Sequence, residues 1–127
     1  MKKEHLNYFN EALNKVLCSI DVNIPIAPAD FENLNVDKKT KDYAVGICWA
    51  DHNGAFLINI DEYFIEQNYE AEINGKWWYL SMVEGKTLLE TICHEIAHIE
   101  HWNHGIKHKE LMRRLLNRVQ GKVERGA

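Results

Sequence analysis

The chain has 127 residues and a formal net charge of −4, with 46% hydrophobic and 27% charged residues. A chain of this length supports one hydrophobic core, so we expect a single domain over residues 1–127, and the composition excludes a disordered protein. No apolar run approaches the roughly 18 residues that a membrane helix needs, and polar residues interrupt the segment where a signal peptide would be apolar. We therefore expect a cytoplasmic protein without membrane contact.

The charges are unevenly distributed along the chain. Residues 1–106 carry a net charge of −9, whereas residues 107–127 carry 7 Lys/Arg against 2 Asp/Glu, a net charge of +5. A basic segment on an acidic body either contacts phosphates or complements the negative end of a helix. Nucleic acid is therefore one candidate partner.

The cysteines are three in number, Cys18, Cys48 and Cys93, and no two of them form a CxxC pair. This pattern argues against a disulfide framework and against a zinc cluster held by thiolates. Each cysteine has apolar neighbours, so we expect all three to be small buried thiols.

The first predicted element is an amphipathic helix over residues 3–19, where apolar residues recur at helical spacing. The segment over residues 21–30 contains both prolines of the chain and predicts an extended connector. A short strand near Phe31 and a charged loop over residues 37–42 are expected next. The apolar positions of the first helix are Leu6, Phe9, Leu13, Val16 and Leu17.

A β-hairpin is the clearest strand prediction. Residues 43–50 and 55–61 flank the sequence DHNG, whose Asn53-Gly54 pair suits a tight turn with positive φ. His52 lies at this turn and is expected to be solvated. Asp61 and Glu62 follow the second strand and are expected to cap a short helix.

The remaining elements are an aromatic segment and two helices. Trp77, Trp78 and Tyr79 are consecutive, a pattern typical of core residues with one exposed ring. Helices are predicted over residues 84–102 and 107–121.

The helix over residues 84–102 has two distinct faces. Its apolar residues recur at spacings of three, four and three, which predicts a stripe facing the core. At 100° per residue, His94, His98 and His101 lie roughly opposite this stripe. One face therefore packs on the body of the protein, while the other presents imidazoles to a cleft. The apolar residues are Leu89, Ile92, Ile96 and Ile99.

The sequence HEIAH, residues 94–98, is an HExxH motif. His94 and His98 are one turn apart, a spacing that lets two imidazoles bind one tetrahedral Zn²⁺. Glu95 is placed to contact a water on that metal and to act as the general base. The motif therefore predicts a catalytic zinc site, because a purely structural zinc would leave Glu95 without a role.

The third zinc ligand is either His104 or His108. His101 is two turns from His94, about 10 Å along an unbroken helix, which is too far for one ion. The Trp102-Asn103-His104-Gly105 segment supplies residues that tolerate the left-handed conformation, so the chain is expected to turn there. His104 follows His98 by six residues, the spacing of HExxHxxGxxH with His101 at the glycine position, and we favour it. A turn only at Gly105 would favour His108.

The motif and the residues after it resemble the SprT-like family of zinc metalloproteases and the related WLM proteases. The resemblance is carried by His94, Glu95 and His98, followed by NHG with His104 and Gly105. The bulky residue that follows in these families corresponds to His108, or to Met112 if His108 is the ligand.

This resemblance implies a zincin-like α+β fold and hydrolysis of peptide bonds. The layout it implies is an N-terminal helix, a small antiparallel sheet with a hairpin, the HExxH helix and a C-terminal helix. In the Spartan branch it implies cleavage of proteins crosslinked to DNA. The chain departs from the family's zinc ribbon, since no cysteine follows Cys93, and DNA contact would fall to the basic C-terminal helix.

We therefore expect a zinc metallopeptidase that acts on a protein or peptide, with Zn²⁺ on His94, His98 and His104 and with Glu95 as general base. Tyr63 and Tyr79 are candidates for stabilising the oxyanion. A rival prediction is a catalytically silent module that binds nucleic acid or a protein through the basic helix. A third is a hydrolase of a non-peptide amide. The sequence specifies neither a natural substrate nor an oligomeric state.

Overall fold

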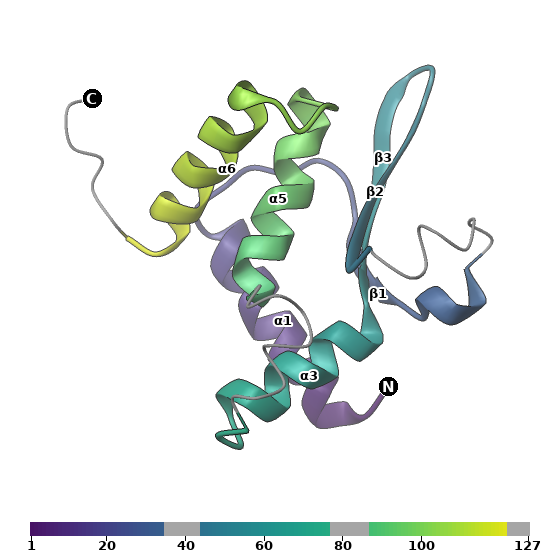
Figure 1. Ribbon diagram of the computed structural model, residues 1–127, viewed down its shortest axis with the longest axis vertical. Coiled ribbons are helices and arrows are strands. Elements are labelled where there is room, and N and C mark those ends of the chain that lie inside the picture. The colour runs from purple at the N-terminus through teal and green to yellow at the C-terminus, as the bar shows by residue number, and fades with distance from the viewer. Residues whose placement is uncertain (35–43, 77–86, 122–127) are drawn as a thin grey trace.

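The computed structural model describes residues 1–34, 44–76 and 87–121. Within these ranges the chain forms an α+β fold, as the sequence predicts (Figure 1). The predictions for the charged loop over 37–42 and for Trp77, Trp78 and Tyr79 fall outside the described residues. The elements are α1 (Lys3–Leu17), β1 (Ile26–Ala29), the 3₁₀ helix η1 (Phe31–Asn33), β2 (Gly46–Asp51), β3 (Gly54–Asp61), α3 (Glu62–Glu72), α5 (Leu88–Glu100) and α6 (Ile106–Val119).

The described sheet has three strands in the order β1-β3-β2. β2 and β3 pair antiparallel, but β1 pairs parallel to β3, so the sheet is mixed and the prediction of an antiparallel sheet is wrong. The strand expected near Phe31 lies earlier, inside the predicted connector, and Phe31 itself begins η1. Pro28 is tolerated in β1 because this strand lies at an edge of the sheet.

The hairpin prediction is confirmed. Residues Asp51 and Gly54 face each other at the end of the ladder, and Gly54 has a φ of 109°. The Asn53 backbone N–H donates to the Asp51 carboxylate at 2.8 Å, which fixes the turn. His52 is exposed, as predicted.

Asp61 connects the hairpin to α3. Its side chain accepts a hydrogen bond from the backbone N–H of Tyr63 at 3.4 Å, so the predicted N-cap is confirmed. In the central strand β3, Ile58 and Ile60 on one face and Asn59 on the other are all buried.

The core lies between the sheet and the helices. α5 contacts α1, α6 and both strands of the hairpin, and is therefore the central helix of the molecule. Figure 1 shows α6 beside α5 on one side and the hairpin on the other. The fully buried residues on three of these elements include Phe9, Val16, Ile58, Ile60, Ile92, Cys93 and Ala97.

Several details of the predicted helices are wrong. Helix α1 ends at Leu17 rather than residue 19, and Leu6 and Leu17 are 40% and 44% exposed. His5 takes a place on the buried face instead, with its ring 4.9 Å from that of Tyr69. Cys18 is exposed, although Cys48 and Cys93 are buried as predicted. In the described part of the chain no helix is both long and apolar enough to cross a membrane.

Candidate metal centre

Helix α5 carries the HEIAH motif and is sharply bounded. Thr87 caps its start, because Oγ1 accepts a hydrogen bond from the Glu90 backbone N–H at 3.2 Å. The helix ends at Glu100, two residues before the predicted end, and His101 is already extended with φ −127° and ψ 92°. His101 therefore does not continue the histidine face of the helix. Ile99 is 39% exposed, so the predicted apolar stripe ends at Ile96.

The early end of α5 brings His104 back to the motif. The Nε2 atoms of His94 and His98 are 3.2 Å apart, and Nε2 of His104 lies 3.2 Å from the first and 3.0 Å from the second. Three ligands of a tetrahedral zinc, each with a Zn–N bond near 2.05 Å, would be separated by about 3.4 Å. The three nitrogens thus form a triangle whose size fits one small metal ion.

The hydrogen bond at the far side of the His98 ring decides which nitrogen is free. Nδ1 of His98 donates to the main-chain carbonyl of His101 at 3.1 Å, because a carbonyl only accepts. In the neutral ring this leaves a lone pair on Nε2, the atom that faces His94 and His104. A backbone carbonyl that holds the second nitrogen is typical of histidine ligands to metals.

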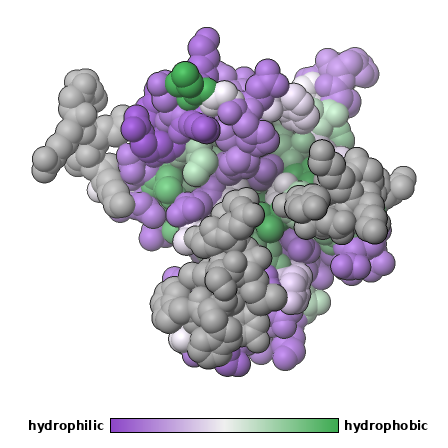
Figure 2. Space-filling view, viewed as in Figure 1, coloured by the Kyte–Doolittle hydropathy of each residue, from purple (hydrophilic) through white to green (hydrophobic). Residues whose placement is uncertain are grey.

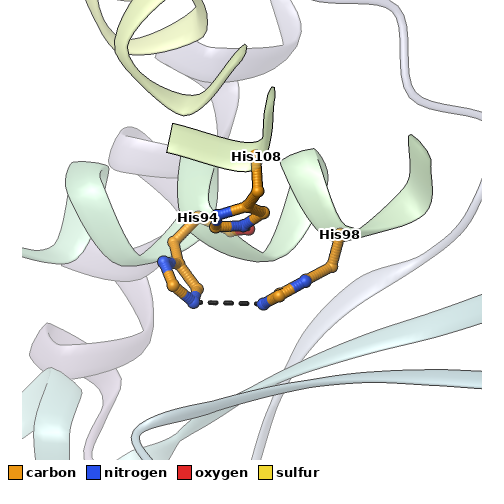
Figure 3. Close-up of side chains that lie close together, drawn as sticks. All are labelled: His94, His98 and His108. Atoms are coloured by element: carbon orange, nitrogen blue, oxygen red, sulfur yellow. Dashed lines mark hydrogen bonds between the residues drawn. The ribbon is translucent and has the colours of Figure 1, made fainter. Parts of the chain in front are cut away.

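His108 contacts the same cluster from helix α6. Its ligand atoms and those of His94 and His98 lie within 4.8 Å of one another, a set close enough to hold a metal ion. However, Nε2 of His108 donates to the main-chain carbonyl of His94 at 3.0 Å. The ring is only 1% exposed and stacks on the His98 ring, with centroids 4.1 Å apart. Figure 3 shows His108 reaching from α6 toward the two histidines of α5.

The two candidate third ligands therefore have different surroundings. Nε2 of His104 lies within 3.2 Å of the other two Nε2 atoms, whereas Nε2 of His108 donates to a backbone carbonyl and leaves Nδ1 as the ligand atom of that ring. The short Nε2 distances favour His104. The predicted turn over Trp102-Asn103-His104-Gly105 is confirmed, since α5 ends at Glu100 and α6 begins at Ile106, although Gly105 is the N-cap of α6 with φ −84° and ψ −172° and is not left-handed.

Glu95 lies beside the histidine triangle and is only 5% exposed. Its Oε1 is 3.8 Å from Nε2 of His94, a separation that leaves the carboxylate at the edge of the candidate metal site. Strand β2 packs directly against this side chain. A Cβ placed on Gly46 would lie 2.8 Å from Cγ of Glu95, so only glycine fits at this position of β2 without a shift.

The histidine triangle and Glu95 open into a cleft of about 920 Å³ between α5 and β2. Figure 2 shows apolar surface in this region, surrounded by hydrophilic side chains. The residues that line the cleft, apart from the motif and His104, are Ala44, Val45, Gly46, Ile47, Cys48, Glu90, Thr91, Trp102 and Met112. Tyr63 does not line it and is 57% exposed, while Tyr79 is outside the described residues.

Burial shifts two pKa values in the cleft. The pKa of His98 is lowered, chiefly because burial disfavours the charged ring and also because His108 and His104 are close. The ring is therefore neutral near pH 7, the state that binds a metal. Burial is the main cause, and the nearby Glu95 carboxylate the second, that raises the pKa of Cys48 to about 11. Cys48 is therefore a neutral thiol in the cleft wall.

Three features of the cleft have no counterpart in the sequence predictions. They are the contact of Gly46 with Glu95, the stacking of His108 on His98, and the presence of Thr91 in the wall. A lone glycine between apolar neighbours does not indicate that Gly46 contacts Glu95. The position of His108 on the same buried face of α6 as Leu115 and Val119 does indicate that its ring packs against α5.

Comparisons with protein-family models, with curated proteins and with solved structures gave no match.

Proposed function

We propose that this protein is a zinc-dependent metallopeptidase with a SprT-like, zincin-type fold. The single observation that carries the proposal is the triangle of Nε2 atoms from His94, His98 and His104, with the Glu95 carboxylate at its edge. A donor set of three imidazoles suits Zn²⁺, and three protein ligands are the number that catalytic rather than structural zinc sites have. The residues present therefore fit the metal.

Zinc held by His94, His98 and His104 would supply Lewis acidity that activates a water molecule and polarises the carbonyl group. The buried carboxylate of Glu95 would take up the proton of the attacking water. The same carboxylate then returns the proton to the leaving amine. Burial of Glu95 between α5 and Gly46 restricts its motion and keeps it beside the histidines.

Strand β2 supports an extended peptide as the substrate. It is an edge strand of the described sheet, and its residues Gly46, Ile47 and Cys48 line the cleft. Such an edge can add one further strand through main-chain hydrogen bonds. A peptide bound there would pass over Gly46 and Cys48, next to Glu95.

The test is proteolysis by zinc-loaded protein, with Glu95→Gln as the inactive variant. This change keeps the size of the side chain and removes the base, so we expect at least a ~100-fold loss of peptide cleavage. Zinc content and melting temperature should stay near those of the wild type. Equal cleavage by both proteins would contradict the proposal. So would a zinc content well below one ion per chain in both proteins.

The rival function is binding of nucleic acid by α6. Its cations lie on exposed positions, and within the described residues none of them forms an ion pair. The buried side of the helix packs on α5, so these charges are also those of an ordinary solvated face. Binding of a DNA duplex that is unchanged by Glu95→Gln, with no cleavage by either protein, would favour the rival. The cations concerned are Lys107, Lys109, Arg113, Arg114 and Arg118.

A further inference from the structure

Trp102 is a large aromatic residue that is exposed at the edge of the candidate metal centre. It lies in the connection between α5 and α6, and its side chain is 59% exposed. Among the exposed large apolar side chains of the described residues, Trp102 is the only one that lines the cleft. Single exposed apolar residues on a surface are normal, whereas an exposed aromatic ring inside a cleft is available to a ligand.

The indole ring is next to one of the proposed zinc ligands. The centroids of the Trp102 and His98 rings are 6.2 Å apart, with an angle of 62° between the ring planes. On the same His98 ring, Nε2 lies within 3.2 Å of the Nε2 atoms of His94 and His104. A metal bound to this Nε2 would be at most about 10 Å from the centre of the indole ring, because a Zn–N bond is about 2.1 Å long.

The cleft that Trp102 lines offers apolar contacts and little to attract a negative charge. Val45 and Ile47 contribute partly buried apolar side chains from β2 and the residue before it, and Met112 contributes another from α6. The acidic side chains in the wall are two glutamates, and within the described residues no lysine or arginine lines it. An acidic substrate side chain would therefore be repelled, whereas an apolar one gains by leaving water for this wall.

We propose that Trp102 is the specificity-determining residue of the cleft and packs against an aromatic side chain of the substrate. Aromatic rings in contact have centroids about 4.5–7 Å apart. Of the distance of about 10 Å, this leaves at most about 5.5 Å, and an extended peptide advances about 3.3 Å per residue. The aromatic residue therefore lies within two positions of the scissile bond. This inference rests on the proposed function, since it takes the histidine triangle as the place of reaction.

The experiment measures binding to the zinc-loaded protein rather than turnover. The probes are short peptides that carry a zinc-binding hydroxamate at the amino end in one series and at the carboxyl end in the other, so that both sides of the metal are tested. In each series the two residues nearest the hydroxamate are both phenylalanine, both alanine or both lysine.

The proteins are the wild type and three variants. Trp102→Ala removes the ring, and Trp102→Phe keeps an aromatic ring at the same place. Ile106→Ala is the matched control, because Ile106 is 75% exposed at the start of α6 but does not line the cleft. Zinc per chain and melting temperature are measured in the same samples.

We expect the wild type to bind the phenylalanine peptide of one series at least ~10-fold more tightly than the alanine peptide, the effect of burying an aromatic side chain against another. Trp102→Phe and Ile106→Ala should keep most of this preference. Trp102→Ala should reduce it at least ~3-fold, with zinc content and melting temperature unchanged.

A preference for phenylalanine that is absent from the wild type, or equally large in Trp102→Ala, would overturn the role of Trp102 and leave the metallopeptidase standing. Tightest binding of the lysine peptides would overturn the choice of an aromatic side chain. A wild type that holds no zinc and binds none of the peptides would remove both proposals.

Discussion

His104 is the residue that completes the histidine triangle, although it lies outside the motif helix. His101 contributes differently, because its main-chain carbonyl accepts the Nδ1–H of His98. His108 contributes through its buried ring, which stacks on His98 and is anchored to the His94 carbonyl. Three neighbouring histidines thus have three separate roles.

These roles predict a graded effect of alanine substitutions on zinc affinity. His104→Ala should weaken zinc binding by more than about 100-fold, because it removes a ligand. His108→Ala should weaken it by roughly 10- to 100-fold, the range found for residues that orient ligands. His101→Ala is the matched control and should have little effect, since the carbonyl that holds His98 remains.

Competition with a chelating dye gives the three affinities. A larger loss in His108→Ala than in His104→Ala would show that His108 is the ligand and would overturn the assignment of His104.

At the scale of elements, the site depends on how closely β2 packs on α5. The backbone of Gly46 lies against the Glu95 side chain, and Ile60 of β3 is also within 3.3 Å of the added Cβ position. Neither neighbour has free space, because both Glu95 and Ile60 are buried. A side chain at Gly46 must therefore move the proposed general base.

We expect Gly46→Ala to lower the rate of peptide cleavage by up to about 100-fold, as small displacements of a reacting group do. The clash should also cost about 1–3 kcal/mol of unfolding free energy. Zinc affinity should be preserved, since the histidines are not displaced. Steady-state kinetics, urea unfolding and dye competition measure the three quantities.

Gly105→Ala is the matched control, because this glycine has open space around it and no positive φ. It should retain most of the activity. Full activity in Gly46→Ala would show that Glu95 is not held by β2.

At the scale of the whole molecule, the histidine cluster makes folding stability depend on pH. The pKa of His98 is lowered in the folded protein, first by burial, whereas the unfolded chain has the ordinary histidine value of about 6.5. Below that value the unfolded state binds more protons than the folded state. The contribution of neutral His98 to the free energy of unfolding is therefore fully present above pH ~6.5. It is lost as the pH falls from there through the lower pKa of the folded protein.

We expect the zinc-free protein to lose unfolding free energy between pH 7.5 and pH 5, measured by urea unfolding at constant ionic strength. Replacing His98 with Gln should flatten this part of the profile. His52→Gln is the control, because His52 is exposed on the hairpin turn and should leave the profile unchanged. A profile of equal slope in His98→Gln would show that the dependence arises elsewhere.

Local patterns in the sequence predicted the hairpin, the Asp61 cap, the motif helix and the pairing of His94 with His98 in space. Each of these depends on residues within one turn or one hairpin, where backbone geometry relates spacing to position. The same patterns overextended α5, placed the first strand too late and treated the sheet as antiparallel. Element ends and strand partners depend on packing between distant segments.

Some features of the candidate site likewise follow from local sequence, and others depend on tertiary packing. The proposed ligand pair and Glu95 follow from the helical period, which puts residues 94 and 98 on one face. Whether His104 or His108 is the third ligand does not, because it depends on where α5 ends and how α6 packs back on it. The places of Gly46 and Thr91 likewise arise from the contact of β2 with α5, across more than forty residues of sequence. Periodicity relates neighbours in a helix, but only the folded chain brings a strand and a helix close enough to make a cleft.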